Sequence, residues 1–215
     1  MRFLKENSLL LLLVLALPLF IFYLDSAVIR AVREFHRAGS DLYVFLSSLD
    51  AVINFLSHGS TLIVIALAML VAGKYRSRKI FEAGKALVVS FVASGILAQV
   101  LKHLIGRARP RVTDTLLFIG PTFRGGYDSF PSGHTTVAFC FAYALSQHFP
   151  RYRVFFYIFA AVAGFERVEN TAHFFSDVIA GAFVGIISGQ LVFRYLLPAL
   201  EKGPLSSPSD KTVGA

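Results

Sequence analysis

The chain has 215 residues, of which 55% are hydrophobic and only 16% are charged, and its mean hydropathy is +0.64. A soluble domain carries about a quarter charged residues, so this composition excludes an ordinary soluble protein and predicts an integral membrane protein. The formal net charge of +8 does not indicate a nucleic-acid partner, because basic residues in such chains report topology, anionic head groups or a charged substrate. The single cysteine, Cys140, excludes an intramolecular disulfide.

The first apolar segment covers residues 8–24 and contains Pro18. A cleaved signal peptide has an apolar core of about 7–15 residues and a small-x-small cleavage site. This segment is longer, and no such site precedes Asp25. We therefore predict a retained transmembrane helix that starts in the cytoplasm.

Residues 26–50 form a polar connector with helical periodicity. Its apolar residues Val28, Ala31, Val32 and Phe35 alternate with the charged residues Arg30, Arg33, Glu34 and Arg37. The pattern predicts an amphipathic helix in the membrane interface. Such a helix either caps the bundle or captures lipid at an entrance.

Five further apolar runs complete the predicted all-α fold, at residues 52–73, 83–104, 135–146, 154–165 and 178–197. With the first run they predict six transmembrane helices in one domain, residues 1–200. A Ser/Pro/Gly-rich tail at 201–215 is expected to be disordered. The positive-inside rule makes one side of this topology cytoplasmic and places both termini there: it carries Arg2 and Lys5, Lys74–Lys79, Arg151–Arg153 and Arg194–Lys202.

The second run carries polar residues in its first turns: Asn54, Ser57, His58 and Ser60. Polar groups at bilayer depth are costly and face protein or water. His58 could line a site, but an interfacial histidine at a helix end is the simpler interpretation.

Three polar clusters lie on the other side, at the ends of the third, fourth and sixth runs. The first contains Lys102 and Arg109, which share a helix face if the helix continues for two turns. Pro110 disfavours helix at Arg109, so we expect the helix to end there with both cations aimed at its exit. The pair suits a phosphate clamp, although helix-end cations also anchor spans at head groups.

The second cluster is the turn Ser129-Phe130-Pro131-Ser132-Gly133-His134. The start of a helix presents free N–H groups and a positive dipole end, which bind anions. Gly133 lets this backbone approach a ligand closely, and Ser132 adds a hydroxyl donor. His134 is placed to protonate a leaving oxygen.

The third cluster contains Arg167, His173 and Asp177. His173 and Asp177 are four residues apart and within reach on one helix face. A carboxylate bonded to one imidazole nitrogen leaves the other nitrogen as a nucleophile; the alternative is a His–Asp pair that caps the last span. Together the clusters predict one phosphate-handling site. No metal or other cofactor is predicted, because no Cys/His or carboxylate-rich set has ligand spacing.

These motifs resemble the type 2 phosphatidic acid phosphatase (PAP2) family, the lipid phosphate phosphatases. The family pattern is K-x6-R-P, P-S-G-H and S-R-x5-H-x3-D, met here by Lys102–Pro110, Pro131–His134 and Arg167–Asp177. The resemblance implies that His173 attacks phosphorus and forms a phosphohistidine, oriented by Asp177, while His134 protonates the leaving group.

The resemblance further implies that five groups stabilise the charge of the phosphate: Lys102, Arg109, Ser132, Gly133 and Arg167. One position departs from the family, because Glu166 stands where a serine is frequent. A carboxylate there repels phosphate unless it points away or pairs with a cation such as Arg107.

The expected activity is metal-independent release of phosphate from a lipid phosphate or pyrophosphate at the non-cytoplasmic face of the inner membrane. Phosphatidic acid, phosphatidylglycerol phosphate, polyprenyl pyrophosphate and a phosphorylated glycolipid all fit. The implied partners are this lipid and the bilayer. A phosphotransferase and a non-enzymatic anion-binding or transport protein are the alternatives; vanadate-dependent haloperoxidases share similar motifs but are soluble.

Overall fold

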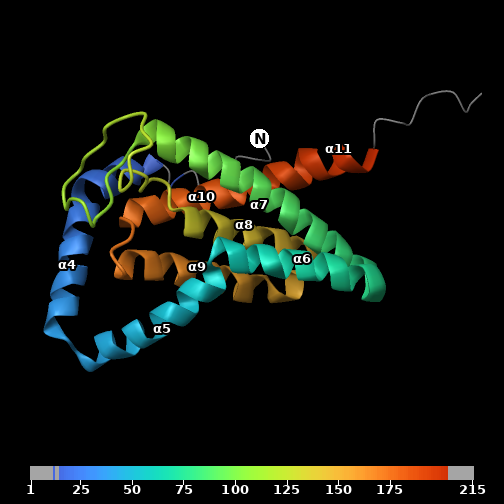
Figure 1. The fold of residues 1–215 in the computed structure, drawn as a ribbon, viewed down its shortest axis with the longest axis horizontal. Helices are drawn as coiled ribbons and strands as arrows, with labels where there is room; N and C mark the ends of the chain where they lie inside the picture. Colours follow the sequence, from blue (N-terminus) through green and yellow to red (C-terminus); the bar gives the residue numbers. More distant parts are fainter. Residues whose placement is uncertain (1–11, 13–14, 203–215) are drawn as a thin grey trace, which may run out of the picture.

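The computed structural model describes residue 12 and residues 15–202 (Figure 1). Within these residues the chain forms helices and no strand, and one isolated β-bridge joins Arg107 to Phe118. The predicted all-α fold class is therefore confirmed. The predicted first span lies partly outside the described residues, and residues 203–215 of the predicted tail lie wholly outside them. Glu201 and Lys202 belong to a helix, which corrects the predicted start of that tail.

The elements in chain order are α3 (Leu17–Leu19), the π-helix η1 (Phe20–Leu24), α4 (Asp25–Ala38), α5 (Asp41–Ser57), α6 (Gly59–Arg76), α7 (Arg78–Ile105), α8 (Gly133–His148), the 3-10 turn η2 (Pro150–Tyr152), α9 (Arg153–Glu169), α10 (Phe175–Leu191), the π-helix η3 (Val192–Leu196) and α11 (Leu197–Lys202). Among the residues that the structure describes, three stretches are long and apolar enough to cross a membrane: Gly59–Arg76, Arg78–Ile105 and Phe175–Leu200. Helices α8 and α9 have only 16 and 17 residues. The six predicted spans are therefore not confirmed.

The N-terminal third differs most from the prediction. The polar connector forms two helices, α4 and α5, and α5 continues into the predicted second span as far as Ser57. His58 then adopts an extended backbone with ψ of 138°, and its Nδ1 accepts a hydrogen bond from the Ser60 N–H at 3.3 Å. This side chain satisfies a free donor at the start of α6. The apolar run at 52–73 is thus divided at His58.

Helix α8 occupies the centre of the bundle and packs against α7, α9 and α10. Ala138 and Ala142 on α8 are fully buried. On the facing side of α10, a Cβ on Gly185 would lie 2.3 Å from the Thr136 carbonyl oxygen. Small residues of this kind let two helices approach closely, and here they set the start of α8 beside the start of α10.

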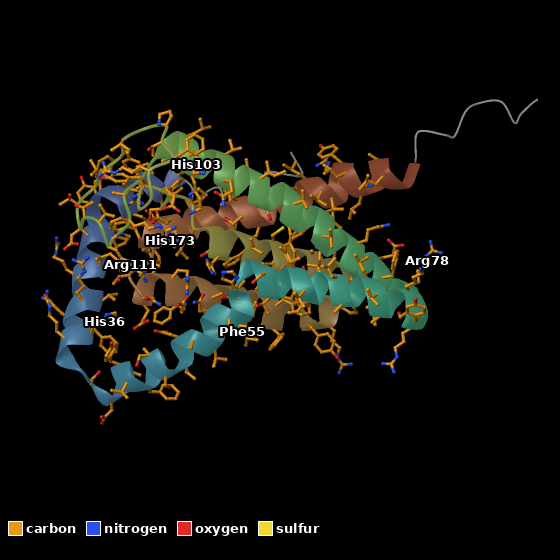
Figure 2. All side chains as sticks on the ribbon, viewed as in Figure 1. His36, Phe55, Arg78, His103, Arg111 and His173 are labelled. Atoms are coloured by element: carbon orange, nitrogen blue, oxygen red, sulfur yellow. The ribbon has the colours of Figure 1, made fainter. Side chains whose placement is uncertain are left out.

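The two ends of the bundle carry different groups. His173 lies at the end where α4 and the loop between α7 and α8 gather, whereas Arg78, the first residue of α7, lies at the opposite end (Figure 2). Helix α7 runs between the two ends (Figure 1). The predicted phosphate-handling clusters and the basic turn between α6 and α7 are therefore separated by the length of the bundle.

Candidate active site

A cavity of about 320 Å³ gathers the three sequence motifs. It is lined by Gly59, Gly95, Ala98, Gln99, Lys102, Arg109, Asp128, Gly133, His134, Val137, Arg167 and His173. Six of the eight predicted site residues belong to this lining, and the other two, Ser132 and Asp177, are fully buried next to it. The structure thus brings together residues from α7, α8, α9 and the segments between helices.

His173 is almost fully buried and holds its two ring nitrogens in different surroundings. Nδ1 lies 3.6 Å from Asp177 Oδ2 and 3.5 Å from Ser129 Oγ. Nε2 lies 3.5 Å from Arg109 Nη1. These separations are long for hydrogen bonds. The ring is placed with Nδ1 toward a carboxylate and Nε2 toward a cation.

Asp177 is fixed from several directions. Its Oδ2 accepts hydrogen bonds from Ser129 Oγ at 2.5 Å and from the Phe174 N–H at 2.8 Å, and its Oδ1 pairs with Arg107 Nη1 at 2.6 Å. The bond from Phe174 caps α10, which begins at Phe175. The sequence expected His173 and Asp177 on one helix face. His173 instead precedes the helix, so the pair meets across the helix start.

Lys102 and Arg109 both line the cavity, but not through a continuous helix. Helix α7 ends at Ile105, four residues earlier than expected, because Gly106 turns the chain with a φ of 61°. A Cβ at Gly106 would lie 1.9 Å from the Gly120 carbonyl oxygen, so both the conformation and the space require glycine. Lys102, in the last turn of α7, donates to the Asp128 carbonyl oxygen.

The turn before α8 gives its residues unequal positions. Gly133 and His134 line the cavity, whereas the Ser132 hydroxyl is fully buried and accepts a hydrogen bond from Thr135 Oγ1 at 2.9 Å. His134 Nε2 is buried without a hydrogen-bond partner among the described residues. The His58 ring lies with its centroid 5.1 Å from that of His134, in an edge-on arrangement. His58 is thus a helix-end histidine, as the simpler interpretation expected, and its ring also lies beside the site.

Glu166 is neutralised locally. This buried carboxylate pairs with the guanidinium of Arg167 and accepts a hydrogen bond from Asn170 Nδ2 at 3.2 Å. Its partner is thus Arg167 and not Arg107. Because Arg167 lines the cavity and Glu166 does not, the carboxylate sits behind the cation rather than facing the cavity.

Burial and neighbouring charges shift the pKa values of two residues at the cavity. Burial lowers the pKa of His173 to about 4; Asp177 opposes this shift, and Lys102 and Arg109 add to it. A hydrogen bond from Arg109 holds the pKa of Asp128 well below its usual range. His173 is therefore an uncharged imidazole at neutral pH, as a nitrogen nucleophile must be.

Sequence reasoning did not single out Asp128, gave Ser129 no role of its own within the second cluster, and preferred an interfacial position for His58, whose ring contacts that of His134. Asp128 and Ser129 lie close to the second motif, but loop carboxylates and hydroxyls carry no helical periodicity that would mark them. No group of three His, Cys, Asp or Glu side chains suited to a metal ion occurs in the part of the chain that the structure describes.

A larger apolar groove of about 750 Å³ lies between α4, α5, α9 and α10. Val28, Val32 and Phe35 of α4 contribute to it, in keeping with the predicted amphipathic pattern. None of the eight predicted site residues lines this groove, and its charged lining residue is Glu169. The predicted phosphate-handling residues therefore gather at the smaller cavity and not in this groove.

Comparison with known proteins identifies the family. The model of the PAP2 superfamily matches residues 83–200, which include all three motifs. The chain belongs to the PAP2 superfamily. The resemblance read from the motifs is thus confirmed.

Individual PAP2 relatives cover different shares of the chain. A lipid A 1-phosphatase from Rhizobium etli is 46% identical over 105 residues, 47% of this chain and 45% of that protein. Phosphatidylglycerophosphatase B from Bacillus subtilis is 30% identical over 192 residues, 81% of this chain and 91% of that protein. The chain spans less than half the length of the lipid A 1-phosphatases that it matches.

A solved structure shares the fold. The crystal structure of a transmembrane PAP2-type phosphatidylglycerolphosphate phosphatase from Bacillus subtilis superposes with a TM-score of 0.67 and 24% identity. The match covers 91% of this chain and 97% of that chain.

Proposed function

We propose that this PAP2 protein is a metal-independent phosphatase that cleaves a phosphate monoester of a membrane lipid and releases phosphate, through a phosphohistidine on His173. The observation that carries the proposal is the setting of the His173 ring. Its Nε2 lies 3.5 Å from Arg109 Nη1 at a cavity that Lys102 and Arg167 also line, while Nδ1 faces Asp177. An imidazole with one nitrogen toward a carboxylate and the other toward cations suits attack on a phosphate.

The first step forms the phosphohistidine. His173 Nε2 attacks phosphorus as the bond from phosphorus to the lipid oxygen breaks, and the leaving oxygen takes a proton from His134. The His173 ring gains positive charge in this step, which the Asp177 carboxylate stabilises. Lys102, Arg109 and the first N–H groups of α8 hold the equatorial oxygens.

The second step releases inorganic phosphate. Neutral His134 takes a proton from a water molecule, the water oxygen attacks phosphorus, and the P–N bond breaks to restore His173. The buried and unpartnered Nε2 of His134 beside the cavity supports this role. An unpaired polar atom at that depth is costly, and a proton shared with a leaving oxygen or a water molecule satisfies it.

A six-span topology with the site at the non-cytoplasmic face of the inner membrane fits this function. The spans are the first apolar run, α6, α7, α8, α9 and α10. The short helices α8 and α9 come close to the about 17 residues that the thinnest spans need. The basic turn around Arg78 lies at the end of the bundle opposite His173 (Figure 2), which supports a cytoplasmic position for that turn.

The substrate is a phosphate monoester on a lipid head group. Two relatives, the lipid A 1-phosphatase and phosphatidylglycerophosphatase B, are named for phosphates carried by lipids. Both substrates present a phosphate at the bilayer surface, where the ends of membrane helices lie. We therefore place lipid A, phosphatidylglycerol phosphate and phosphatidic acid first among the candidates.

The test is phosphate release by the purified protein in detergent micelles, with EDTA present. The panel contains these three lipids and a polyprenyl pyrophosphate, and products are analysed with and without an acceptor lipid. We expect release from at least one monoester, reduced by about 10³-fold or more in His173→Ala, whereas His103→Ala stays active because His103 does not line the cavity. Undiminished release by His173→Ala, or transfer to the acceptor in place of release, would contradict the proposal.

A further inference from the structure

A buried guanidinium links two carboxylates behind the nucleophile. Arg107, 1% exposed, pairs through Nη1 with Asp177 Oδ1 at 2.6 Å and through Nη2 with Asp25 Oδ2 at 2.7 Å. Asp25 is the first residue of α4 and lies outside the residues that the family model matches. We propose that Arg107 and Asp25 are positioning residues for the reaction. They hold Asp177 in place and set the negative electrostatic potential at the His173 ring. This inference rests on the proposed function.

The two oxygens of Asp177 have separate partners. Oδ1 belongs to Arg107, while Oδ2 accepts from Ser129 Oγ and the Phe174 N–H and faces His173 Nδ1 at 3.6 Å. With both oxygens held, the carboxylate cannot rotate away from the imidazole. Arg107 also fixes Ser129, because the Ser129 N–H donates to the Arg107 carbonyl oxygen at 3.0 Å.

The guanidinium is itself clamped in place. Its carbon lies 4.3 Å from the centre of the Phe174 ring, and Nη1 donates to Ser176 Oγ at 2.7 Å. Phe174 follows His173 directly in the chain. The packing of Arg107 therefore fixes the backbone that carries the nucleophile as well as the carboxylate that faces it.

Asp25 completes the arrangement with both of its oxygens. Oδ1 accepts from the Ser176 N–H at 2.9 Å, and Oδ2 accepts from Ser176 Oγ at 2.5 Å as well as from Arg107. Its side chain is 2% exposed, so its charge is not screened by water. The N-terminal segment thus contributes directly to the setting of the nucleophile.

The net charge of Arg107, Asp177 and Asp25 explains why both carboxylates are needed. Arg107 alone would cancel the charge of Asp177, because opposite charges at this distance in a buried site interact strongly. Asp25 supplies a second negative charge, so the three side chains together carry one net negative charge next to His173. That charge is what the ring needs when Nε2 bonds to phosphorus and the imidazole becomes positive.

A purely structural cluster and a positioning cluster make different predictions for pH dependence. The titratable and charged groups that face His173 are Asp177, Lys102, Arg109 and His134, and the Ser129 hydroxyl also contacts it. Substitutions at Arg107 or Asp25 leave all five of these side chains in the protein. Any shift in the acid limb of kcat/KM then reports the charge that the cluster presents to His173.

The two single substitutions shift this limb in opposite directions. Arg107→Gln removes a positive charge, which strengthens the negative field on the ring and raises the pKa of His173, so the limb moves to higher pH. Asp25→Asn leaves Arg107 unbalanced against Asp177 and lowers that pKa, so the limb moves to lower pH. The double variant restores one net negative charge and returns the limb close to its wild-type position.

The experiment measures kcat, KM and the pH profile of lipid phosphate hydrolysis for the wild type, both single variants and the double variant. We expect each single variant to lose about 10- to 100-fold in kcat, the loss typical of residues that orient metal-binding histidines, with KM changed less than about threefold. The limbs are expected to shift apart by about half a pH unit or more. Two limbs at the wild-type position, or limbs shifted in the same direction, would overturn the positioning role.

Two further measurements keep the outcomes separate. Thermal unfolding in detergent shows whether each variant folds. If Arg107→Gln does not fold, Arg107→Lys takes its place. We expect Arg107→Lys to lower kcat without shifting the acid limb, because lysine keeps the positive charge but lacks the two guanidinium nitrogens that bind Asp177 and Asp25. Failure of the proposed function has its own signature, undiminished hydrolysis by His173→Ala. Normal kcat in folded Arg107→Lys and Asp25→Asn variants, together with inactive His173→Ala, overturns only the role of the cluster.

Discussion

Arg109 and Asp128 form a two-bond clamp at the wall of the cavity, with Arg109 Nε 2.8 Å from Asp128 Oδ1 and Nη2 2.7 Å from Oδ2. The clamp uses one edge of the guanidinium and leaves Nη1 toward His173 Nε2, 3.5 Å away. A planar guanidinium held in this way is oriented before any phosphate arrives. Asp128 thus sets the direction of the cation that faces His173.

Asp128→Asn tests this orientation. The amide keeps the shape of the side chain but can accept at only one atom and carries no charge, so Arg109 is held less firmly. We expect kcat/KM to fall by about 10-fold, and further in Asp128→Ala, since charge-assisted hydrogen bonds are worth about 1.5–3 kcal/mol. Steady-state kinetics measure both. Faster turnover in Asp128→Asn than in the wild type would show instead that the carboxylate competes with phosphate for Arg109.

The pH profile of the wild type tests the state of the nucleophile. The pKa of His173 is lowered to about 4 by burial, so protonation removes the nucleophile only at acid pH. We expect kcat/KM to rise with pH through about 4 and to be independent of this group above about 5. A profile whose acid limb lies near the ordinary histidine value of about 6.5 would contradict the burial of His173 in the working enzyme.

Gly185→Ala tests the close packing of α8 against α10. The new methyl group would lie 2.3 Å from the Thr136 carbonyl oxygen, a backbone atom that cannot move without shifting α8. We expect a loss of about 1–3 kcal/mol in the free energy of unfolding, seen as a lower midpoint of thermal unfolding in detergent. Gly95→Ala is the matched control, because nothing lies within 4 Å of its added Cβ. An equal midpoint for both variants would contradict the packing.

The pH dependence of stability that arises from Asp50 tests the polar contact between α5 and α9. Burial and the neighbouring Glu169 and Glu166 raise the pKa of Asp50 to about 6. The folded state therefore binds more protons than the unfolded state between pH about 4 and 6, and its stability falls as pH rises through this window.

The corresponding variant is Asp50→Asn, which removes the charge that Glu169 and Glu166 repel. We expect a higher midpoint of thermal unfolding than the wild type at pH 7.5 and a smaller difference at pH 4.5. Asp41→Asn, in the first turn of the same helix, is the control and is not expected to raise the midpoint, since an acid favours that helix end. A gain in midpoint of Asp50→Asn over the wild type that is smaller at pH 7.5 than at pH 4.5 would contradict the account.

The sequence was informative wherever residue type and spacing carry a local physical meaning. Gly133 and His134 at the start of an apolar run predict a helix N-terminus beside an anion, and α8 begins at Gly133. Lys102 and Arg109 are placed on one cavity, as their spacing suggested, although by a different backbone path. The composition and the motifs were sufficient for the all-α class and the superfamily.

The remaining features depend on partners that are distant in sequence. Arg107 and Asp25 are 82 residues apart, and no local pattern marks Arg107 as the partner of both Asp25 and Asp177. The break at His58 interrupts an apolar run whose hydropathy continues on both sides, because the histidine caps α6 through its ring. The sequence left open whether Glu166 points away from the phosphate or pairs with a cation, and the structure shows its pairing with Arg167. Spacing predicts helix faces, but not which side chains meet across helices.

The central claim is that His173 carries the phosphoryl group, and trapping the phosphoenzyme tests it most directly. The protein is mixed with a lipid labelled in its phosphate, quenched in alkaline detergent, where phosphohistidine survives, and digested to locate the label. We predict acid-labile label on the peptide that contains His173 in the wild type and none in His173→Ala. Label that persists in His173→Ala, or that resides on another residue in the wild type, would contradict the account.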